Sequence, residues 1–473
     1  MTAAVLTPEQ RFQAELDSAN LTRPMWMLWL LSAGLIALDG FEFFLIGVAL
    51  PFIQRDFGLS ASWVGALATA ALVGALIGSL TLGPITDRVG RQRMLVIDIA
   101  LFVVASLATA LAWNATSLLF FRFLVGVGIG ADYPISVAYI TENVPARFRG
   151  RRVIGACSFQ AVGALLGALV GWLTIFVFQQ VAPELAVGYA WRWMLGVGVA
   201  LSVLVGGLRL LFLLESPSYY LAKGEYTEAS EAASQLLGKE IVLKPSVNPE
   251  SDTTTELESL SYADLFSSTY RQQTALAAIP WFLQDIATYG IGIFTPTIIG
   301  ALAFSEESGF LTQEMASARG AAIVNVFLVV GFALAIVLIN RVGRIPLQIV
   351  GFIGMALGLG TLSLPGAGTQ LSLLFTGFIL FNLAMNLGPN STTFLLSGEV
   401  FPSAIRASGA GLAGGIAKSG AVLGAWALPV LQEMFGVGLV MRSLAIICLI
   451  AATVTHLLRQ ATPNKLPDKT STH

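Results

Sequence analysis

Gly83-Pro-Ile-Thr-Asp87-Arg88-Val-Gly90-Arg91 follows the second of about twelve long apolar runs, and a related sequence, Asn340-Arg341-Val-Gly343-Arg344, follows the eighth. A second pair recurs in the same way. Glu142-Asn-Val-Pro145-Ala-Arg-Phe-Arg149 follows the fourth run, and Glu399-Val-Phe-Pro402-Ser-Ala-Ile-Arg406 follows the tenth. Two sequences that recur at matched positions indicate two structurally related halves.

The composition is that of a membrane protein. Apolar residues make up 55% of the chain, charged residues only 11%, and the mean hydropathy is +0.77, whereas a soluble domain carries about 25% charged residues. A net charge of -2 gives no basic field for nucleic acid. Cys157 and Cys448 lie inside apolar runs, and His456 and His473 are near the C-terminal end. We therefore expect no disulfide framework, metal site, cofactor or enzyme activity.

Twelve runs approach the roughly 20 apolar residues that a spanning helix needs. They lie at about 25–50, 62–86, 93–113, 116–141, 153–178 and 190–214, and then at 273–302, 317–339, 345–365, 370–395, 406–431 and 436–458. The predicted fold is an all-α polytopic membrane protein with 12 transmembrane helices in two six-helix bundles. The predicted parts are an N-terminal segment (1–24), a first bundle (25–215), a polar linker (216–272), a second bundle (273–459) and a tail (460–473).

The basic residues predict the orientation. Positive charge collects in the loops on the same side as the two ends of the chain and the linker, so this side should be cytoplasmic. The segment before Met25 is polar and acidic, unlike a signal peptide, so we expect the first helix to remain as an anchor. The short loops favour a plasma membrane, most simply a bacterial inner membrane.

The Gly-x-x-x-Asp-Arg-x-Gly-Arg loop resembles the signature of the major facilitator superfamily, and the resemblance covers the whole chain. It implies a charge latch between the halves that closes the cytoplasmic side in one state. The expected gate residues are Asp87, Arg88, Arg91, Glu142, Arg149, Arg341, Glu399 and Arg406. Asn340 replaces the acid in the second copy, so that latch should be weaker. Alternatively, the arginines only fix the topology.

Motifs inside the apolar runs resemble the phosphate:proton symporter family of the sugar-porter-like branch. They are Gly128-Ile-Gly130-Ala-Asp132-Tyr133-Pro134, Gln160, Trp281-Phe-Leu-Gln-Asp285-Ile-Ala-Thr-Tyr289 and Gly388-Pro389-Asn390. The resemblance implies a substrate pocket of Tyr133, Gln160, Trp281, Asp285, Tyr289 and Asn390. Leu38-Asp39-Gly40-Phe41-Glu42-Phe43 in the first helix resembles aromatic-acid and other metabolite:proton symporters instead, which leaves the substrate open.

Charged side chains inside the spans indicate a polar pathway between the halves, because each costs about 2.5–3.5 kcal/mol to insert. Proton coupling is assigned to Asp39, Glu42, Arg122 and Asp132, with Asp39 as the first candidate for the transported proton and Asp132 as the second. A buried carboxylate holds its proton more tightly without a partner than beside a cation, so Arg122 could switch Asp39 between the two conditions. A permanent Asp39–Arg122 ion pair is the structural alternative.

The pocket residues suit a small oxyanion. Trp281, Asp285 and Tyr289 are spaced by four, so they share one helix face over about 12 Å. Tyrosine, amide and indole groups donate to phosphate oxygens, Asp285 can accept from a P–OH group, and Lys418 supplies positive charge. The sequence thus predicts a proton-coupled symporter that transports inorganic phosphate by alternating access. Its expected partners are the small anion, protons and the lipid bilayer, and we expect it to act as a monomer.

Three other functions stay open at this point. The closest is a proton symporter for an organic acid or another small metabolite. The others are a non-transporting sensor and an exporter on the same fold.

Overall fold

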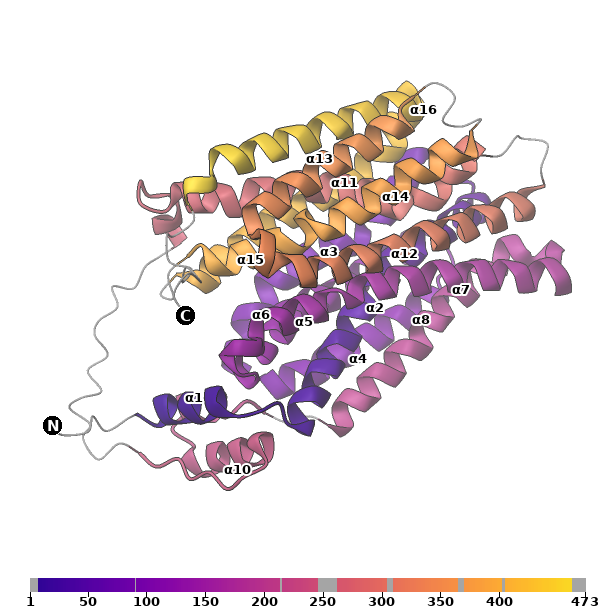
Figure 1. Cartoon of the computed structure of the whole chain (residues 1–473). Coiled ribbons are helices and arrows are strands. Elements are labelled where there is room, and N and C mark those ends of the chain that lie inside the picture. Colours follow the sequence, from indigo (N-terminus) through magenta and orange to yellow (C-terminus); the bar gives the residue numbers. More distant parts are fainter. Residues whose placement is uncertain are drawn as a thin grey trace.

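The computed structural model describes residues 7–89, 91–212, 215–245, 262–303, 309–364, 370–401 and 405–461. Within these ranges, the backbone alone is described at several positions, chiefly 83–89, 91–93, 131–139, 141–142, 149–150 and 406–407. The described residues form helices, so the predicted all-α class is confirmed. The helices run side by side in two adjoining groups (Figure 1).

The first six apolar runs form the helices of the first bundle. These are α2 (Arg23–Phe57), α3 (Ala61–Val89), α4 (Arg91–Ala110), α5 (Ala115–Asn143), α6 and α7 (Ala146–Cys157 and Phe159–Val181), and α8 (Ala186–Leu211), which follows η1 (Pro183–Leu185). The fifth run is therefore two helices that meet at Ser158, directly before the predicted site residue Gln160.

The other six runs form the second bundle. These are α11 (Arg271–Ala303), α12 (Phe310–Val342), α13 (Arg344–Leu362), α14 and α15 (Leu371–Leu387 and Pro389–Glu399), and α16 (Arg406–Leu457), which η4 (Arg459–Ala461) follows. The tenth run is interrupted at Gly388, where φ is -109° and ψ is -100°. The last two runs are continuous in α16 except at Gly436, whose φ of 76° suits glycine and divides the helix into two spans.

Local sequence signals explain where these helices begin and end. The Thr22 hydroxyl accepts a hydrogen bond from the Met25 amide at the start of α2, and Gly58 ends the helix with φ 62°. Asn114 and Ser117 form a reciprocal capping box at the start of α5. The 35 residues of α2 extend about 52 Å at 1.5 Å per residue, more than the hydrocarbon core requires.

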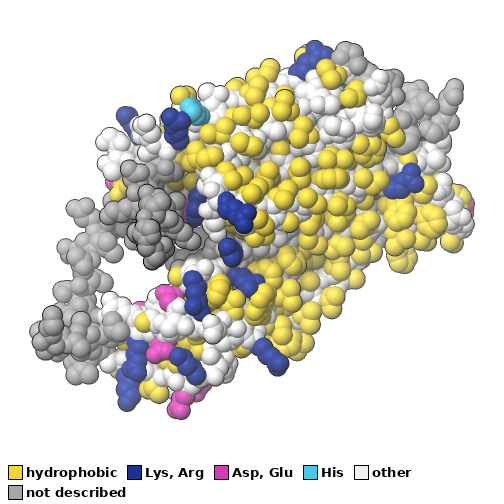
Figure 2. All heavy atoms as spheres, in the orientation of Figure 1, with side chains coloured by type: hydrophobic (Ala, Val, Ile, Leu, Met, Phe, Trp, Pro, Cys, Tyr) yellow, Lys and Arg dark blue, Asp and Glu magenta, His cyan; other side chains and the backbone are white. Residues whose placement is uncertain are grey.

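Eight spans among the described residues are long and apolar enough to cross a membrane, and 96–110 and 115–130 add two shorter apolar segments. Figure 2 shows the consequence: hydrophobic side chains cover a broad band of the surface, and most charged groups gather at the end that carries α1 and α10. Helix α11 carries buried Gln284, Asp285 and Thr288, so its polar side chains face the interior.

A small module lies at one end of the first bundle, which we call the linker end. It consists of α1 (Pro8–Ser18), α9 (Pro217–Ala222) and α10 (Tyr226–Leu237), packed around Phe12, Leu16 and Leu236. η3 (Tyr262–Phe266) precedes α11. Lys239 donates to Glu15 at 2.5 Å, and this hydrogen bond and the lysine charge lower the pKa of the Glu15 carboxyl.

The two bundles pack closely at the opposite end, the far end, where α2 ends and α3 begins. The Phe52 and Phe310 rings are 5.0 Å apart, and the Arg55 guanidinium lies 4.5 Å from the Phe310 ring centre. A Cβ atom at Gly47 of α2 would collide with the Ile293 carbonyl oxygen of α11. Glycine at this position therefore lets a helix from each bundle approach to backbone contact, which closes the far end.

Candidate functional site

A polar cluster at the boundary between the bundles joins α7, α11 and α16. Lys418 Nζ donates to the Tyr289 hydroxyl at 2.8 Å, and Gln160 Nε2 donates to the same oxygen at 3.3 Å. Lys418 Nζ also lies 3.9 Å from Asp285 Oδ2. Four predicted site residues from three helices thus meet in one cluster: Gln160 of α7, Asp285 and Tyr289 of α11, and Lys418 of α16.

The hydrogen bonds at Tyr289 decide what this cluster can bind. A phenol oxygen accepts through its lone pairs and has one O–H to donate. Two N–H groups already donate to the Tyr289 oxygen, so its own proton is left for another acceptor. The cluster therefore offers donors and positive charge to an anion.

Asp285 supplies the opposite chemistry. The residue is only 2% exposed, and its Oδ2 accepts no hydrogen bond from the described part of the chain. At 3.9 Å the lysine is an ion-pair partner but too distant for a hydrogen bond. A buried carboxylate oxygen without a donor is costly, so it is a ready acceptor for a ligand that carries a hydroxyl.

Aromatic rings form the wall of the cluster. The Phe43 ring of α2 meets the Tyr289 ring edge to face at 5.7 Å, and Lys418 Nζ lies 6.0 Å and 4.6 Å from the two ring centres. Phe43 belongs to α2, one turn after Asp39. The first helix therefore contributes to the same site as α11 and α16.

The remaining predicted residues of α11 and α15 lie around a second polar group. Asn390 is half-buried, accepts from Gln284 Nε2 at 3.1 Å and donates to Asn386 Oδ1 at 2.8 Å. The Trp281 ring meets the Phe394 ring at 6.1 Å. The sequence motifs did not single out Gln284, although it is buried and directly precedes Asp285.

The intramembrane ion pair differs from the pairing considered in the sequence analysis. Arg122 Nη1 lies 2.8 Å from Glu42 Oε2, and Nη2 donates to the Glu42 carbonyl oxygen at 3.1 Å. The Arg122 side chain has no exposed surface and Glu42 only 3%. The arginine partner in this structure is Glu42 rather than Asp39, because α2 turns Glu42 toward α5.

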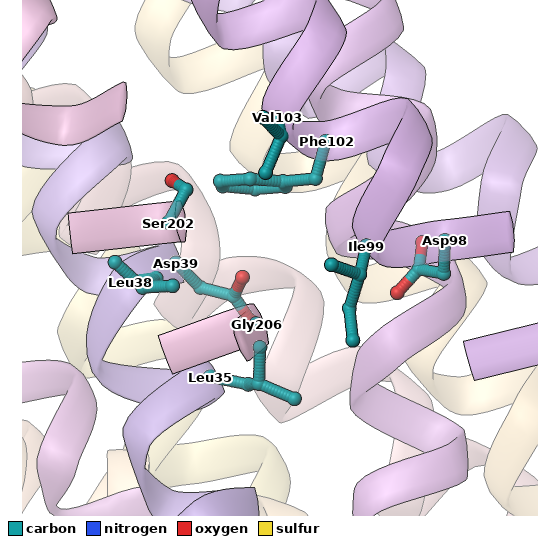
Figure 3. A pocket seen from close by; sticks show the side chains of 9 residues that line it. All are labelled: Leu35, Leu38, Asp39, Asp98, Ile99, Phe102, Val103, Ser202 and Gly206. Atoms are coloured by element: carbon teal, nitrogen blue, oxygen red, sulfur yellow. The ribbon is translucent and has the colours of Figure 1, made fainter. Parts of the chain in front are cut away.

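Asp39 lies one helical turn away and lines a pocket within the first bundle (Figure 3). Figure 3 shows its carboxylate beneath the Phe102 ring, with Asp98 of α4 beyond Ile99. The pocket is lined by Leu35, Leu38, Asp39, Asp98, Ile99, Phe102, Val103, Ser202 and Gly206. Asp98 was missed in the sequence analysis, although an acid in an apolar run is a detectable signal.

Several predicted residues lie outside the described side chains. Asp132 and Tyr133 belong to α5, and only the backbone of these two residues is described. The same holds for the expected gate residues Asp87, Arg88, Arg91, Glu142, Arg149 and Arg406. Among the described gate residues, Arg341 is exposed, and Glu399 pairs with Arg344 at 2.7 Å within its own bundle. Glu399 therefore makes a contact inside one half in this structure.

The family follows from comparison of the whole chain. A family profile described as sugar (and other) transporter matches residues 18–465. The chain belongs to this family. It is therefore an integral membrane transporter of the major facilitator type, and the expected superfamily is confirmed.

Relatives of this transporter carry different substrates. It is 31% identical to a putative metabolite transport protein, YaaU, of Escherichia coli K12, over 91% of this chain and 90% of the relative. It is 28% identical to a repressible high-affinity phosphate permease of Neurospora crassa (77% and 69% covered) and 28% identical to the 4-hydroxybenzoate transporter PcaK of Pseudomonas aeruginosa (88% of each).

A solved structure shares the fold. The partially occluded inward-open conformation of the xylose transporter XylE from E. coli matches with a TM-score of 0.71 and 21% identity, covering 92% of this chain and 98% of that one.

Proposed function

We propose that this transporter is a proton-coupled symporter of inorganic phosphate that works by alternating access. The observation that carries the proposal is the Tyr289 hydroxyl, which accepts from Lys418 and Gln160 and so has its proton left to donate. Beside it stands Asp285, whose buried Oδ2 lacks a donor. Dihydrogen phosphate both accepts and donates, and this pairing of groups matches it.

The expected binding mode follows from these groups. Phosphate oxygens accept from Tyr289, from Gln160 and from the Lys418 ammonium, and one P–OH donates to Asp285 Oδ2. The substrate would enter between Lys418 and Asp285, whose 3.9 Å separation already exceeds a hydrogen bond. Trp281 and Asn390 would complete the pocket, and the motif resemblance adds Tyr133 to this proposal. The Lys418 ammonium attracts an anion but gains little from an uncharged sugar, so an anion fits better.

Proton coupling is assigned to the acids of the first bundle. Glu42 beside Arg122 and Asp39 beside its pocket are two buried carboxylates one turn apart. Asp132 stays part of this proposal, and Asp98 joins it because it lines the same pocket as Asp39. A proton on Glu42 would weaken its attraction to Arg122 and thereby link protonation to the packing of α2 on α5.

The setting of the transport cycle is also part of the proposal. The expected gate residues of the two halves open and close the linker end, while close helix packing closes the far end. We assign the linker end and both termini to the cytoplasm on the distribution of Lys and Arg, and the membrane to a bacterial inner membrane.

The decisive experiment is uptake of labelled phosphate by proteoliposomes under an imposed pH gradient. The parent protein should accumulate phosphate when the outside is acidic, and a protonophore should abolish the accumulation. Asp285→Asn should lose binding, and Glu42→Gln should lose coupling. Parent protein that is folded and reconstituted but takes up no phosphate would refute the proposed substrate.

A second candidate is symport of an aromatic carboxylate. The Phe43 and Tyr289 rings lie edge to face beside Lys418, an arrangement that also suits an aromatic ring with a carboxylate on the lysine. Competition separates the candidates: excess 4-hydroxybenzoate should leave phosphate uptake unchanged if phosphate is the substrate. Direct uptake of labelled 4-hydroxybenzoate without phosphate uptake would favour the second candidate.

A further inference from the structure

Gln284 is a fully buried amide at the edge of the proposed substrate site. It has no exposed surface, and it precedes Asp285 on α11. Its Nε2 donates to Asn390 Oδ1 at 3.1 Å, and its Oε1 accepts from the Thr393 hydroxyl at 2.9 Å. Both bonds cross from α11 to α15, so this side chain joins the helix of Asp285 to the helix of Asn390.

A line of amides determines how these side chains are oriented. Each primary amide has one donor end and one acceptor end. Asn386 Nδ2 donates to the Asn382 carbonyl oxygen at 3.1 Å, and this backbone group can only accept. Asn386 must therefore turn its Oδ1 toward Asn390, which donates to it at 2.8 Å. Asn390 in turn directs its own oxygen at Gln284.

This order leaves a defined group at Asn390. Its Oδ1 is occupied by Gln284 Nε2, and one of its two N–H groups is used by Asn386. The second N–H is then the group that a half-buried Asn390 can present to a ligand. An oxygen in its place would repel phosphate oxygens, whereas an N–H donates to them.

We propose that Gln284 is a positioning residue for the oxyanion site: it holds the Asn390 oxygen and so keeps an Asn390 N–H directed at the substrate. This inference rests on the proposed function, because it assumes that the substrate is an oxyanion. It assigns Gln284 a role exerted through Asn390 rather than through contact with the substrate.

The test compares phosphate KM and maximal rate for Gln284→Met, Asn390→Ala and the double variant. Methionine keeps the length of the side chain and removes both polar ends. The loss of one hydrogen bond should raise KM about tenfold, while the maximal rate changes little. If Gln284 acts through Asn390, the double variant should be no worse than Asn390→Ala alone.

Gln348→Met is the matched control. Gln348 is also fully buried in the second bundle and makes two hydrogen bonds, to Thr455 and Thr392, but it has no bond to Asn390. The control should lower thermal stability and leave KM at the parent value. An equal rise in KM for both glutamine variants would reduce Gln284 to a general packing role and overturn the proposal.

Gln284→Glu tests the donor directly. A protonated glutamic acid can donate to Asn390 and accept from Thr393, as glutamine does, whereas a carboxylate can only accept. The KM of Gln284→Glu is compared with that of the parent at each pH. The difference between the two should shrink at acidic pH, where the new carboxyl is protonated. A Glu variant no better than the Met variant there, an unchanged KM for Gln284→Met, or additive effects with Asn390→Ala would each refute the inference.

The parent protein separates this test from that of the function. If the parent transports no phosphate, the proposed function fails. The same variants are then compared for 4-hydroxybenzoate, whose carboxylate is also an oxyanion.

Discussion

Replacing Glu42 by glutamine should uncouple transport from the proton gradient. The Arg122 guanidinium is fully buried, and its contacts are Glu42 Oε2 at 2.8 Å and the Glu42 carbonyl oxygen at 3.1 Å. Glutamine keeps the carbonyl contact and an amide oxygen, but it cannot exchange a proton and leaves the arginine charge uncompensated. Removing one partner of a buried ion pair destabilises the fold by about 3–5 kcal/mol. Because Glu42→Gln retains two contacts to Arg122, its destabilisation should lie near the lower end of this range.

The size of the transport effect follows from the gradient. One pH unit corresponds to about 1.36 kcal/mol per proton, which is a tenfold accumulation. With the membrane potential clamped at zero, the parent should concentrate phosphate about tenfold per coupled proton. Glu42→Gln should only equilibrate phosphate, whereas exchange of labelled for unlabelled phosphate should persist because it needs no net proton movement.

The assay measures accumulation and exchange in the same vesicles, with Asp39→Asn as the matched control one turn away. If Glu42 carries the proton, Asp39→Asn should keep more of the accumulation than Glu42→Gln does. Accumulation by Glu42→Gln equal to that of the parent would refute the reasoning. Loss confined to Asp39→Asn would restore Asp39 as the proton carrier.

Three further predictions concern the site, the far end and the linker end. Lys418→Met should raise phosphate KM at least tenfold, because a charge-assisted hydrogen bond is lost; an unchanged KM would contradict the anion site. Gly47→Leu should prevent close packing at the Ile293 carbonyl and hold the far end open. A cysteine introduced at the far end should then react faster with an impermeant thiol reagent than it does without Gly47→Leu. The pKa of Glu15 is lowered by Lys239, so their pair stabilises the fold above the unfolded pKa and is lost as pH falls through the folded one. Lys239→Met should therefore lower the free energy of unfolding at neutral pH by less than about 1 kcal/mol, because the pair is so exposed. The melting temperature should fall slightly at neutral pH and stay unchanged in acid; a difference that persists in acid would exclude the ion pair as its cause.

The sequence by itself determined the helical class and the order of the apolar runs, because a run of about 20 apolar residues satisfies its own backbone hydrogen bonds in lipid as a helix. The breaks at Ser158 and Gly388 and the continuity of α16 came from the structure. The sequence also determined which residues of one helix act together. Trp281, Asp285 and Tyr289 share a face through their spacing alone, and the structure places Asp285 and Tyr289 beside Lys418.

Tertiary structure decided which residues of different helices meet. Asp39 and Glu42 are one helical turn apart, and the rotation of α2 against α5 determines that Arg122 pairs with Glu42. The role of Gln284 likewise depends on α15 presenting Asn390 to α11. Helical spacing fixes directions around one axis, but the rotation and tilt of each helix relative to the others come from side-chain packing over the whole bundle, which no local pattern contains.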